Sequence, residues 1–520
     1  MKQYVSVCGK YVNELFLFIL LLTTTLPVDK VLPDSVIAPR WYTALFVACL
    51  WGVFALSRKK YSIDYSLCSF ALLLVCAFQS SLYFAQTAGI LQTCDGETVC
   101  FSNAAGLSSC LCFSIPALCY MVKSSGRPIS TVSFCVLICC MLVVVCLRSR
   151  TGMVCLALLG FTLVCRKKLL IYGYVVSLLL LLPLCFWLLK PASTLGRRFV
   201  IQRTFDMILQ HPLTGCGPHG FLANYMHVQA DFFVRHPYCE YVQLADDMCH
   251  PLNEYLLIAV DYGLAGLLLI IIFAWYVAKH YINHKSVSGF VGMTTLIFIA
   301  VFSMFSYPLS YPFTWVVLIF SLCLIFRDNR NCIVNGVLAK LTVLILLFMG
   351  SLVVCVYQYG LKWERVKEKV NEGYRSGVRK QYEDLYPILQ YNSRFLYNYT
   401  YALYMLRDYE ESLKIAIECQ RIHSDYNLSP LIGDIYLALG KDEMAIRQYL
   451  LAHHMCPCRF APLCAIYDVY KQQCNYKKCK MMSKIILEKP IKIRSPETLE
   501  YIDYIKRDIN ELILKKQVKR

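Results

Sequence analysis

The sequence predicts an all-α protein with two parts, a polytopic helical membrane bundle of about eleven spans and a C-terminal solenoid of paired helices. Hydrophobic residues make up 58% of the 520 positions and charged residues only 17%, which excludes a single soluble globule and a disordered chain. The charge is uneven, because residues 1–360 hold 24 Lys/Arg and 14 Asp/Glu whereas residues 361–520 hold 28 and 20. A long apolar part therefore precedes an ordinary soluble part.

Eleven apolar runs define the bundle over residues 1–357. Most approach the ~20 residues that cross ~30 Å of hydrocarbon, and the sixth run is the shortest. The first run follows Lys2 and Lys10 but lacks a convincing cleavage site, so it is interpreted as a retained span and not as a signal peptide. The runs are 12–28, 39–57, 65–86, 100–122, 130–147, 151–165, 169–189, 263–281, 288–306, 312–326 and 334–357.

Lys and Arg gather in the loops on one side of the bundle, while the loop with Asp95 and Glu97 on the other side is acidic. Because positive loops stay in the cytoplasm, the N-terminus is expected there. An odd number of spans then places the long loop 190–262 and everything after residue 357 on the outer side, which for a protein of the bacterial inner membrane is the periplasm. The basic set is Lys2, Lys10, Arg58, Lys59, Lys60, Lys123, Arg127, Arg166, Lys167, Lys168, Lys279, Lys285, Arg327 and Arg330.

The net charge of +18 does not indicate a nucleic-acid partner, because the basic residues are spread over loops and form no single patch. Most of the 28 cysteines stand inside apolar runs, where they are expected to act as small hydrophobes. Each of two outer loops holds more than one cysteine, and spacing alone does not determine which of them form disulfides. They are Cys94 and Cys100 in one loop, and Cys216, Cys239 and Cys249 in the other.

A repeat of about 33–34 residues runs over 395–490. In its clearest unit, small residues stand where two helices cross, aromatics fill the gap and a proline ends the second helix, which is the tetratricopeptide pattern. A linker helix over 358–394 precedes the repeats, and an amphipathic basic helix over 491–520 is expected to close the solenoid. Such a surface suits a protein partner, although a capping or folding role is an alternative. The pattern residues are Gly433, Tyr436, Gly440, Ala445, Tyr449, Ala452 and Pro457.

Arg148 and Arg150 stand on the outer side of the bundle, against the charge rule. A guanidinium at the membrane boundary binds two phosphate oxygens at once, so an anionic lipid head group is a suitable ligand. The alternative is a side chain that only reaches for the interface. That alternative is favoured for Arg148, and a functional role is favoured for Arg150.

The outer loop 190–262 gathers polar groups. Arg197, Arg198 and Arg203 begin a helical stretch, in which Phe199, Phe205 and Ile208 are expected on the bilayer side and Arg197 on a cavity. The segment HPLTGCGPHGF, which starts at His211, has loop composition, and its amides are candidates for contact with an oxyanion.

His250 precedes the start of a helix at NEYLL and is a candidate general base, because its pKa lies near working pH. Glu254 is the rival base. The bland interpretation of Asn253 and Glu254 is helix capping. A metal site at Asp246, Asp247 and His250 lacks a defined spacing, so no metal and no other cofactor is expected.

Three stretches in this order resemble the O-antigen ligase superfamily, in the subgroup with C-terminal tetratricopeptide repeats. They are RSRTG at 148–152, GRRFVIQRTFDMILQHPLTGCGPHGF at 196–221 and HPLNEYLLIAVDYGLAGLL at 250–268. The resemblance covers about 1–357, with the periplasmic loop 190–262 as the catalytic part, and 395–490 for the repeats.

The resemblance implies an inverting, metal-independent transfer of a glycan from undecaprenyl diphosphate to an acceptor hydroxyl. By position, Arg150 and Arg197 would bind the diphosphate, while Asn253, Gly263 and Gly266 would be motif residues, with Arg203 and His211 in support. The family has a histidine immediately before the asparagine, where this chain has Leu252. The assignment of His250 as the base therefore stays open.

The acceptor is open between a lipid A core, a growing glycan and a protein hydroxyl, so ligase, polymerase and protein O-oligosaccharyltransferase are alternatives. The repeats favour a protein acceptor somewhat. A transporter of lipid-linked sugar is disfavoured, because the spans show no internal repeat and few buried charges. A membrane-anchored scaffold would need one span and no polar loop of this length.

Overall fold

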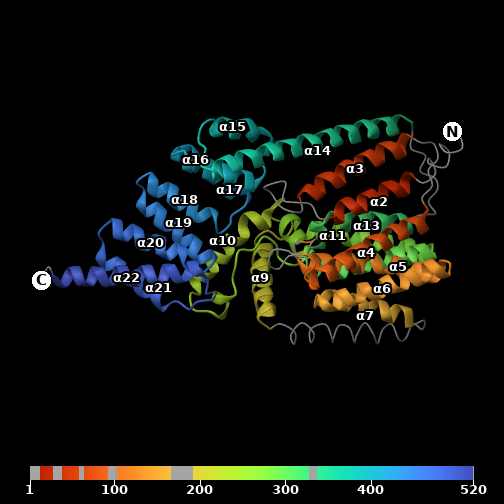
Figure 1. The fold of residues 1–520 in the computed structure, drawn as a ribbon, viewed down its shortest axis with the longest axis horizontal. Helices are drawn as coiled ribbons and strands as arrows, with labels where there is room; N and C mark the ends of the chain where they lie inside the picture. Colours follow the sequence, from red (N-terminus) through yellow and green to blue (C-terminus); the bar gives the residue numbers. More distant parts are fainter. Residues whose placement is uncertain are drawn as a thin grey trace. The chain divides into compact units, whose positions relative to one another are not determined.

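The computed structural model describes residues 12–26, 38–57, 64–91, 101, 103–164, 191–326, 336–492 and 494–518. These residues form two compact units of helices (Figure 1). The first unit lies within Met1–Leu189, Leu252–Tyr255 and Leu268–Arg365, and the second within Lys190–Pro251, Leu256–Leu267 and Val366–Arg520. No β-strand occurs in these ranges, so the predicted all-α class is confirmed.

Ten of the eleven predicted spans coincide with described helices, and the run 169–189 lies outside the described residues. Six described helices are long and apolar enough to cross a membrane: Ala38–Leu56, Tyr65–Thr87, Ala104–Ser124, Arg127–Cys146, Glu254–Asn283 and Lys340–Asn371. The other apolar helices of the first unit are shorter. The helices that carry the predicted spans are α2 (Val12–Thr25), α3 (Ala38–Ser57), α4 (Tyr65–Thr87), α5 (Ala104–Ser124), α6 (Arg127–Cys146), α7 (Arg150–Val164), α11 (Glu254–Asn283), α12 (Val287–Ser303), α13 (Pro312–Ile325) and α14 (Gly336–Asn371).

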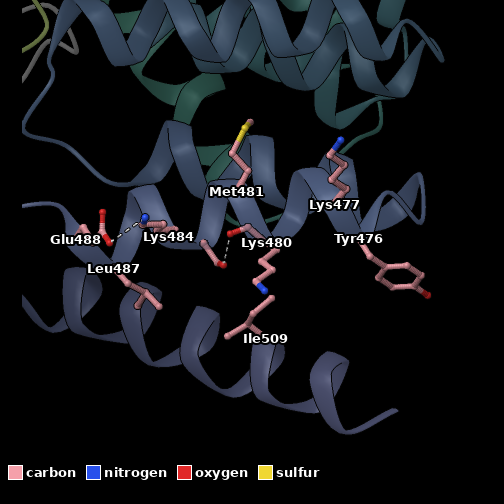
Figure 2. A pocket seen from close by; sticks show the side chains of 9 residues that line it. Tyr476, Lys477, Lys480, Met481, Lys484, Leu487, Glu488 and Ile509 are labelled. Atoms are coloured by element: carbon pink, nitrogen blue, oxygen red, sulfur yellow. Dashed lines mark hydrogen bonds and ion pairs between the residues drawn. The ribbon is translucent and has the colours of Figure 1, made fainter. Parts of the chain in front are cut away.

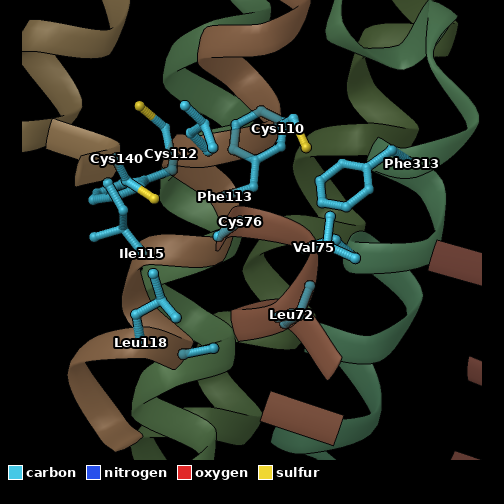
Figure 3. Close-up of a cluster of buried hydrophobic side chains, with 14 of the residues drawn as sticks. Leu72, Val75, Cys76, Cys110, Cys112, Phe113, Ile115, Leu118, Cys140 and Phe313 are labelled. Carbon is cyan, nitrogen blue, oxygen red and sulfur yellow. The ribbon is translucent and has the colours of Figure 1, made fainter. Parts of the chain in front are cut away.

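Helix α5 forms the centre of the first unit, and it packs against α4, α6, α7, α12 and α13. Asn103 caps its start by accepting the Gly106 N–H at 2.8 Å. Figure 3 shows the core around it, in which Cys76, Cys110, Cys112 and Cys140 are each 0% exposed and carry free thiols. The expectation that these cysteines act as small hydrophobes is confirmed.

The second unit joins the long loop to the repeats. The loop folds into α9 (Pro191–Gln210), α10 (Gly220–Arg235) and a short 3-10 turn, Glu240–Gln243. Three helix pairs coincide with the predicted repeats. Helix α22 packs against α20 and α21 as the expected terminal helix. The helices are α15 (Val378–Leu389), α16 (Ser393–Met405), α17 (Tyr409–Ile422), α18 (Leu428–Ala438), α19 (Asp442–Met455), α20 (Ala461–Gln472), α21 (Tyr476–Glu488) and α22 (Pro496–Val518).

Two predicted boundaries differ from the helices. Helix α14 continues past residue 357 to Asn371, so residues 358–371 of the expected linker extend the last span, and α15 is a separate helix. Helix α11 begins at Glu254, nine residues before the predicted span, and is kinked at Gly263. The basic loop residues at 58–60, 166–168, 327 and 330, together with Lys2, Lys10, Cys94 and Cys100, lie outside the described residues.

Candidate functional site

The segment that begins at His211 packs against the kink in α11. The amide of Cys216 donates to the Val260 carbonyl at 2.7 Å, and the amide of Gly217 donates to the Asp261 carbonyl at 3.0 Å. At the kink the helix has carbonyls that its own amides do not satisfy, so the loop supplies the missing donors. These amides are engaged within the protein, and the expectation that they contact an oxyanion is wrong for both.

Two further backbone hydrogen bonds join the same segments, and in these the donors belong to α11 and the acceptors to the loop. The amide of Leu264 donates to the Pro212 carbonyl at 2.8 Å, and that of Ala265 donates to the Leu213 carbonyl at 3.3 Å. Gly263 lies between these bonds with φ of 66°, a conformation that favours glycine. The motif glycine is therefore required by the loop contact.

Asp261 anchors the end of the same loop. Its side chain is 8% exposed, and Oδ1 accepts the Phe221 N–H at 3.1 Å, at the start of α10. A carboxylate near the N-terminus of a helix satisfies free amides and interacts favourably with the helix dipole. Sequence reasoning missed Asp261, although an acidic residue within the apolar run LLIAVDYGLAG was a signal.

The apolar face of α9 is buried within the second unit. Phe199 is 1% exposed and its ring stacks on Tyr241 with centroids 4.9 Å apart, while Ile208 is 8% exposed in the core shared with α10. Of the three residues predicted to face the bilayer, only Phe205 is exposed, at 50%. The predicted bilayer orientation of Phe199 and Ile208 is wrong, because both fill the space between the loop helices.

The arginines of α9 have different surroundings. Arg203 pairs with Asp206 at 2.7 Å, and its guanidinium lies 4.3 Å from the ring centroid of Phe232. It therefore helps to fix α9 on α10. One turn and a half earlier, Arg197 is half-buried and Arg198 is exposed. His211 is exposed and contributes its carbonyl, which accepts the Gly215 N–H at 3.1 Å.

The RSRTG stretch forms the turn between α6 and α7. Arg148 has φ of 49°, and its amide and that of Ser149 donate back to the last turn of α6, as in a Schellman motif. The Ser149 hydroxyl then accepts the Gly152 N–H at 3.2 Å and caps α7. A Cβ on Gly152 would stand 2.4 Å from the Ser108 hydroxyl, so this position requires a glycine. Arg148, Ser149 and Gly152 therefore have structural roles in the turn. Arg150 is the first residue of α7 and is half-buried.

Asn253 and Glu254 connect the start of α11 to the turn after α12. The Asn253 amide donates to the Met304 carbonyl at 2.9 Å, and Glu254 Oε1 accepts the Leu309 N–H at 2.9 Å. Glu254 is 5% exposed. Leu252, at the position of the family histidine, has φ of 58°, and His250 lies just before it, half-buried. Through its bond with Leu309, the Glu254 side chain holds the start of α11 to the turn after α12.

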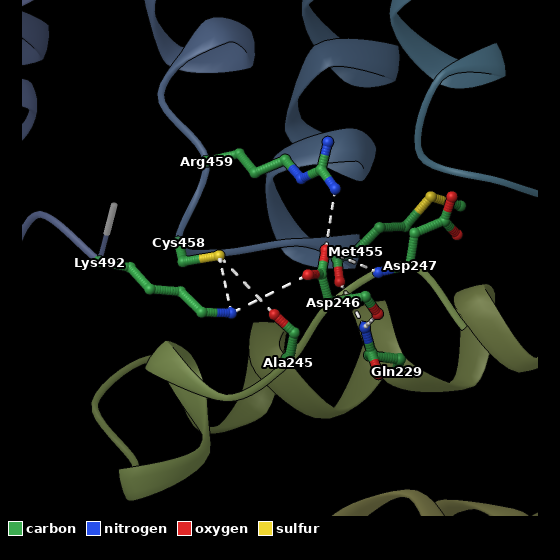
Figure 4. Close-up of polar contacts among 8 residues, drawn as sticks. All are labelled: Gln229, Ala245, Asp246, Asp247, Met455, Cys458, Arg459 and Lys492. Carbon is green, nitrogen blue, oxygen red and sulfur yellow. Dashed lines mark hydrogen bonds and ion pairs between the residues drawn. The ribbon is translucent and has the colours of Figure 1, made fainter. Parts of the chain in front are cut away.

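A polar cluster joins the loop to the repeats within the second unit (Figure 4). Gln229 on α10 is 0% exposed, and its amide donates to the Met455 carbonyl at 2.6 Å and to the Asp246 carbonyl at 3.0 Å. The Asp246 carboxylate pairs with Arg459 at 2.8 Å and with Lys492 at 4.0 Å. The loop and the repeats therefore share one folded unit.

The carboxylate of Asp247, the next residue in the loop, is buried with less compensation from positive charge than that of Asp246. Burial, with the neighbouring Asp425 carboxylate as the next contribution, raises the pKa of Asp247 to about 6. Burial alone would raise the pKa of Asp246 as well, but the hydrogen bond from Arg459 holds it below its usual value. Asp246 thus takes part in an ion pair. Within the described ranges, no group of three metal-binding side chains is found.

These features define a multi-pass helical membrane protein whose long loop is folded onto helical repeats. Residues 134–271 match the family model described as O-antigen ligase. The match confirms, for this segment, the resemblance to O-antigen ligases that was predicted from the sequence. The match includes the RSRTG turn, α9, α10 and the kink at Gly263.

No curated protein matches the chain. Among solved structures, the crystal structure of yeast Tom70 is similar with a TM-score of 0.26 and 11% identity, covering 92% of this chain and 96% of that chain. A TM-score of this size does not bear on the fold. The helix pairs from Ser393 to Glu488 therefore rest on their own packing.

Proposed function

We propose that the protein transfers a glycan from undecaprenyl diphosphate to an acceptor hydroxyl on the periplasmic side of the inner membrane. The observation that supports this most is that the O-antigen ligase match over 134–271 contains Arg150, Arg197 and His250. Within it, the motif glycines have a structural purpose, because Gly215 and Gly263 allow the loop to approach α11.

Arg150 and Arg197 bind the diphosphate in this proposal. The acceptor oxygen attacks the anomeric carbon, the bond from that carbon to the phosphate oxygen breaks, and undecaprenyl diphosphate leaves with an added negative charge. Fixed guanidinium groups stabilise that charge more in the transition state than in the ground state. Arg150 lies in the first unit and Arg197 in the second, and the role of each is carried over from the family by position.

His250 is the proposed general base, which takes the proton of the acceptor hydroxyl as the new bond forms. Glu254 is the alternative. The burial of Glu254 and its contact with the Leu309 N–H favour a positioning role, in which it holds the start of α11. The inverted configuration and the independence from metal are carried over from the family.

The acceptor is proposed to be a lipid A core sugar, with a growing glycan or a protein hydroxyl as the alternatives. A transporter of lipid-linked sugar is the less favoured function. The repeats share a core with α10 through Tyr426, Ala452 and Met455. Part of their surface is thereby committed to the loop, which weakens the argument that they exist only to bind an acceptor protein.

Glycan analysis of a deletion strain tests the function. Loss of long-chain banding of lipopolysaccharide, restored by the wild-type gene, is the expected result. Loss of glycoprotein staining with normal lipopolysaccharide would move the assignment to protein glycosylation. An unchanged glycan profile in both would contradict the proposal.

A further inference from the structure

An open groove lies between the last two helices of the solenoid, α21 and α22 (Figure 2). Its volume is about 830 Å³. It belongs to the second unit and stands apart from the motif residues in the sequence. Its lining is Tyr476, Lys477, Lys480, Met481, Ser483, Lys484, Leu487, Glu488 and Ile509.

Three lysines follow one face of α21 along this groove. Lys477, Lys480 and Lys484 are exposed and spaced three and four residues apart, so they cover about 10 Å of helix. The acidic residue in the lining, Glu488, lies 3.8 Å from Lys484, and the groove keeps a positive balance. Charges set in a row on a folded helix favour a ligand with matching negative charges.

The groove also has apolar atoms that face solvent. Met481 is 54% exposed and Leu487 is 39% exposed. Together with the lysines, these side chains give the groove both apolar and cationic contact groups.

The two walls of the groove are held in place by the solenoid core. Ile486 of α21 and Ile505 of α22 are both 0% exposed. The carboxylate of Asp508 accepts a hydrogen bond from the Tyr467 hydroxyl at 2.6 Å, and Lys471 pairs with it from α20. The groove therefore exists before a ligand binds, which lowers the entropy cost of binding.

We propose that this groove binds an acidic amphipathic helix of a partner protein. The apolar face of that helix would lie on Met481, Leu487 and Ile509, and its carboxylates would pair with the lysines, as in other helix-in-groove complexes. A membrane surface fits less well, because apolar side chains that line a hollow cannot enter a bilayer as projecting ones do. This partner site goes beyond glycan transfer and does not depend on it.

The test uses the full-length protein in phosphatidylcholine nanodiscs. The probe is a fluorescein-labelled helical peptide of about 16 residues with leucines on one face and glutamates on the other. Fluorescence anisotropy is expected to show saturable binding that is absent from empty nanodiscs. The triple variant Lys477→Glu, Lys480→Glu, Lys484→Glu should weaken binding at least ~10-fold, and Met481→Glu should also weaken it.

The matched control reverses three exposed lysines of the second unit on other elements, Lys380→Glu, Lys414→Glu and Lys441→Glu, which changes the net charge equally and should leave binding within about 2-fold. Equal loss in both triple variants, or no saturable binding by wild type, would overturn the proposal. So would binding of phosphatidylglycerol vesicles that depends on the groove lysines while the peptide does not bind. Thermal unfolding of every variant separates lost binding from lost folding.

Discussion

A Cβ placed on Gly263 would stand 2.2 Å from the carbonyl oxygen of Leu213. The loop and α11 thus meet backbone to backbone, and no side chain fits between them. Gly215 meets the same limit from the other side, where an added Cβ would lie 2.6 Å from the Asp261 carbonyl. The glycines of the motif are therefore explained by packing, and they place α10 and the preceding loop against the kinked helix.

Gly263→Ala is expected to lower the free energy of unfolding by on the order of 3 kcal/mol, because it adds both the overlap and the left-handed strain. Thermal unfolding and glycan transfer should both decline. Gly196→Ala on α9 is the control, since nothing lies within 4 Å of its added Cβ and alanine favours a helix by up to ~1 kcal/mol. Equal melting temperatures for the two variants would show that the contact is not formed.

Gln229→Leu is expected to loosen the repeats from the loop. It leaves the Met455 and Asp246 carbonyls without their donor, which costs roughly 1–3 kcal/mol for each buried group. Limited proteolysis should then cleave the loop faster. The control variant Gln210→Leu, which changes an exposed amide at the end of α9, should be cleaved at the wild-type rate. If the two variants behave alike, the cluster in Figure 4 does not hold the loop.

Deletion of the repeats, residues 395–520, tests their part in activity. From the sequence alone, the deletion is expected to change acceptor choice more than donor hydrolysis. Because Tyr426 and Met455 belong to one core with α10, the structure instead predicts that both activities fall together. Donor hydrolysis that stays at the wild-type level while transfer is lost would contradict the shared core.

The raised pKa of Asp247 predicts a pH dependence of stability. The folded value is about 6 against ~3.9 for an unfolded aspartate, so the folded state binds the proton more tightly. This contribution is fully present below about pH 4 and is lost as the pH rises through 6, for a total of about 1–2 kcal/mol after discounting for partial exposure. Asp247→Asn should flatten melting temperature against pH over this window. Asp231→Asn, at an exposed site, should keep the wild-type slope.

His250→Ala is expected to slow transfer by at least ~100-fold if the imidazole is the general base. Glu254→Gln keeps the shape of the side chain. It should lower the stability of the protein, but the transfer rate of the folded protein should change little. A mild effect of the first and a severe rate effect of the second would reassign the base to Glu254.

The sequence predicted the helical class, most spans and the repeats, because apolar length and helix-pair spacing are local signals. It also predicted that Gly263 matters. What it missed depends on distant contacts: Asp261 with Phe221, Gln229 with Met455, and the burial of Phe199. Phe199 and Phe205 look alike along the chain, and only the packing of α9 against α10 separates the buried ring from the exposed one.

The central claim is that two guanidinium groups bind the leaving diphosphate. The most direct measurement is the rate of transfer from a purified polyprenyl-diphosphate glycan to its acceptor, in nanodiscs, for Arg150→Ala and Arg197→Ala beside the neighbouring controls Arg148→Ala and Arg198→Ala. The first two should lose about 2–4 kcal/mol of transition-state stabilisation, enough to bring transfer close to background, while the protein still inserts and melts as wild type and the controls stay active. Wild-type transfer by both Arg150→Ala and Arg197→Ala would contradict the account.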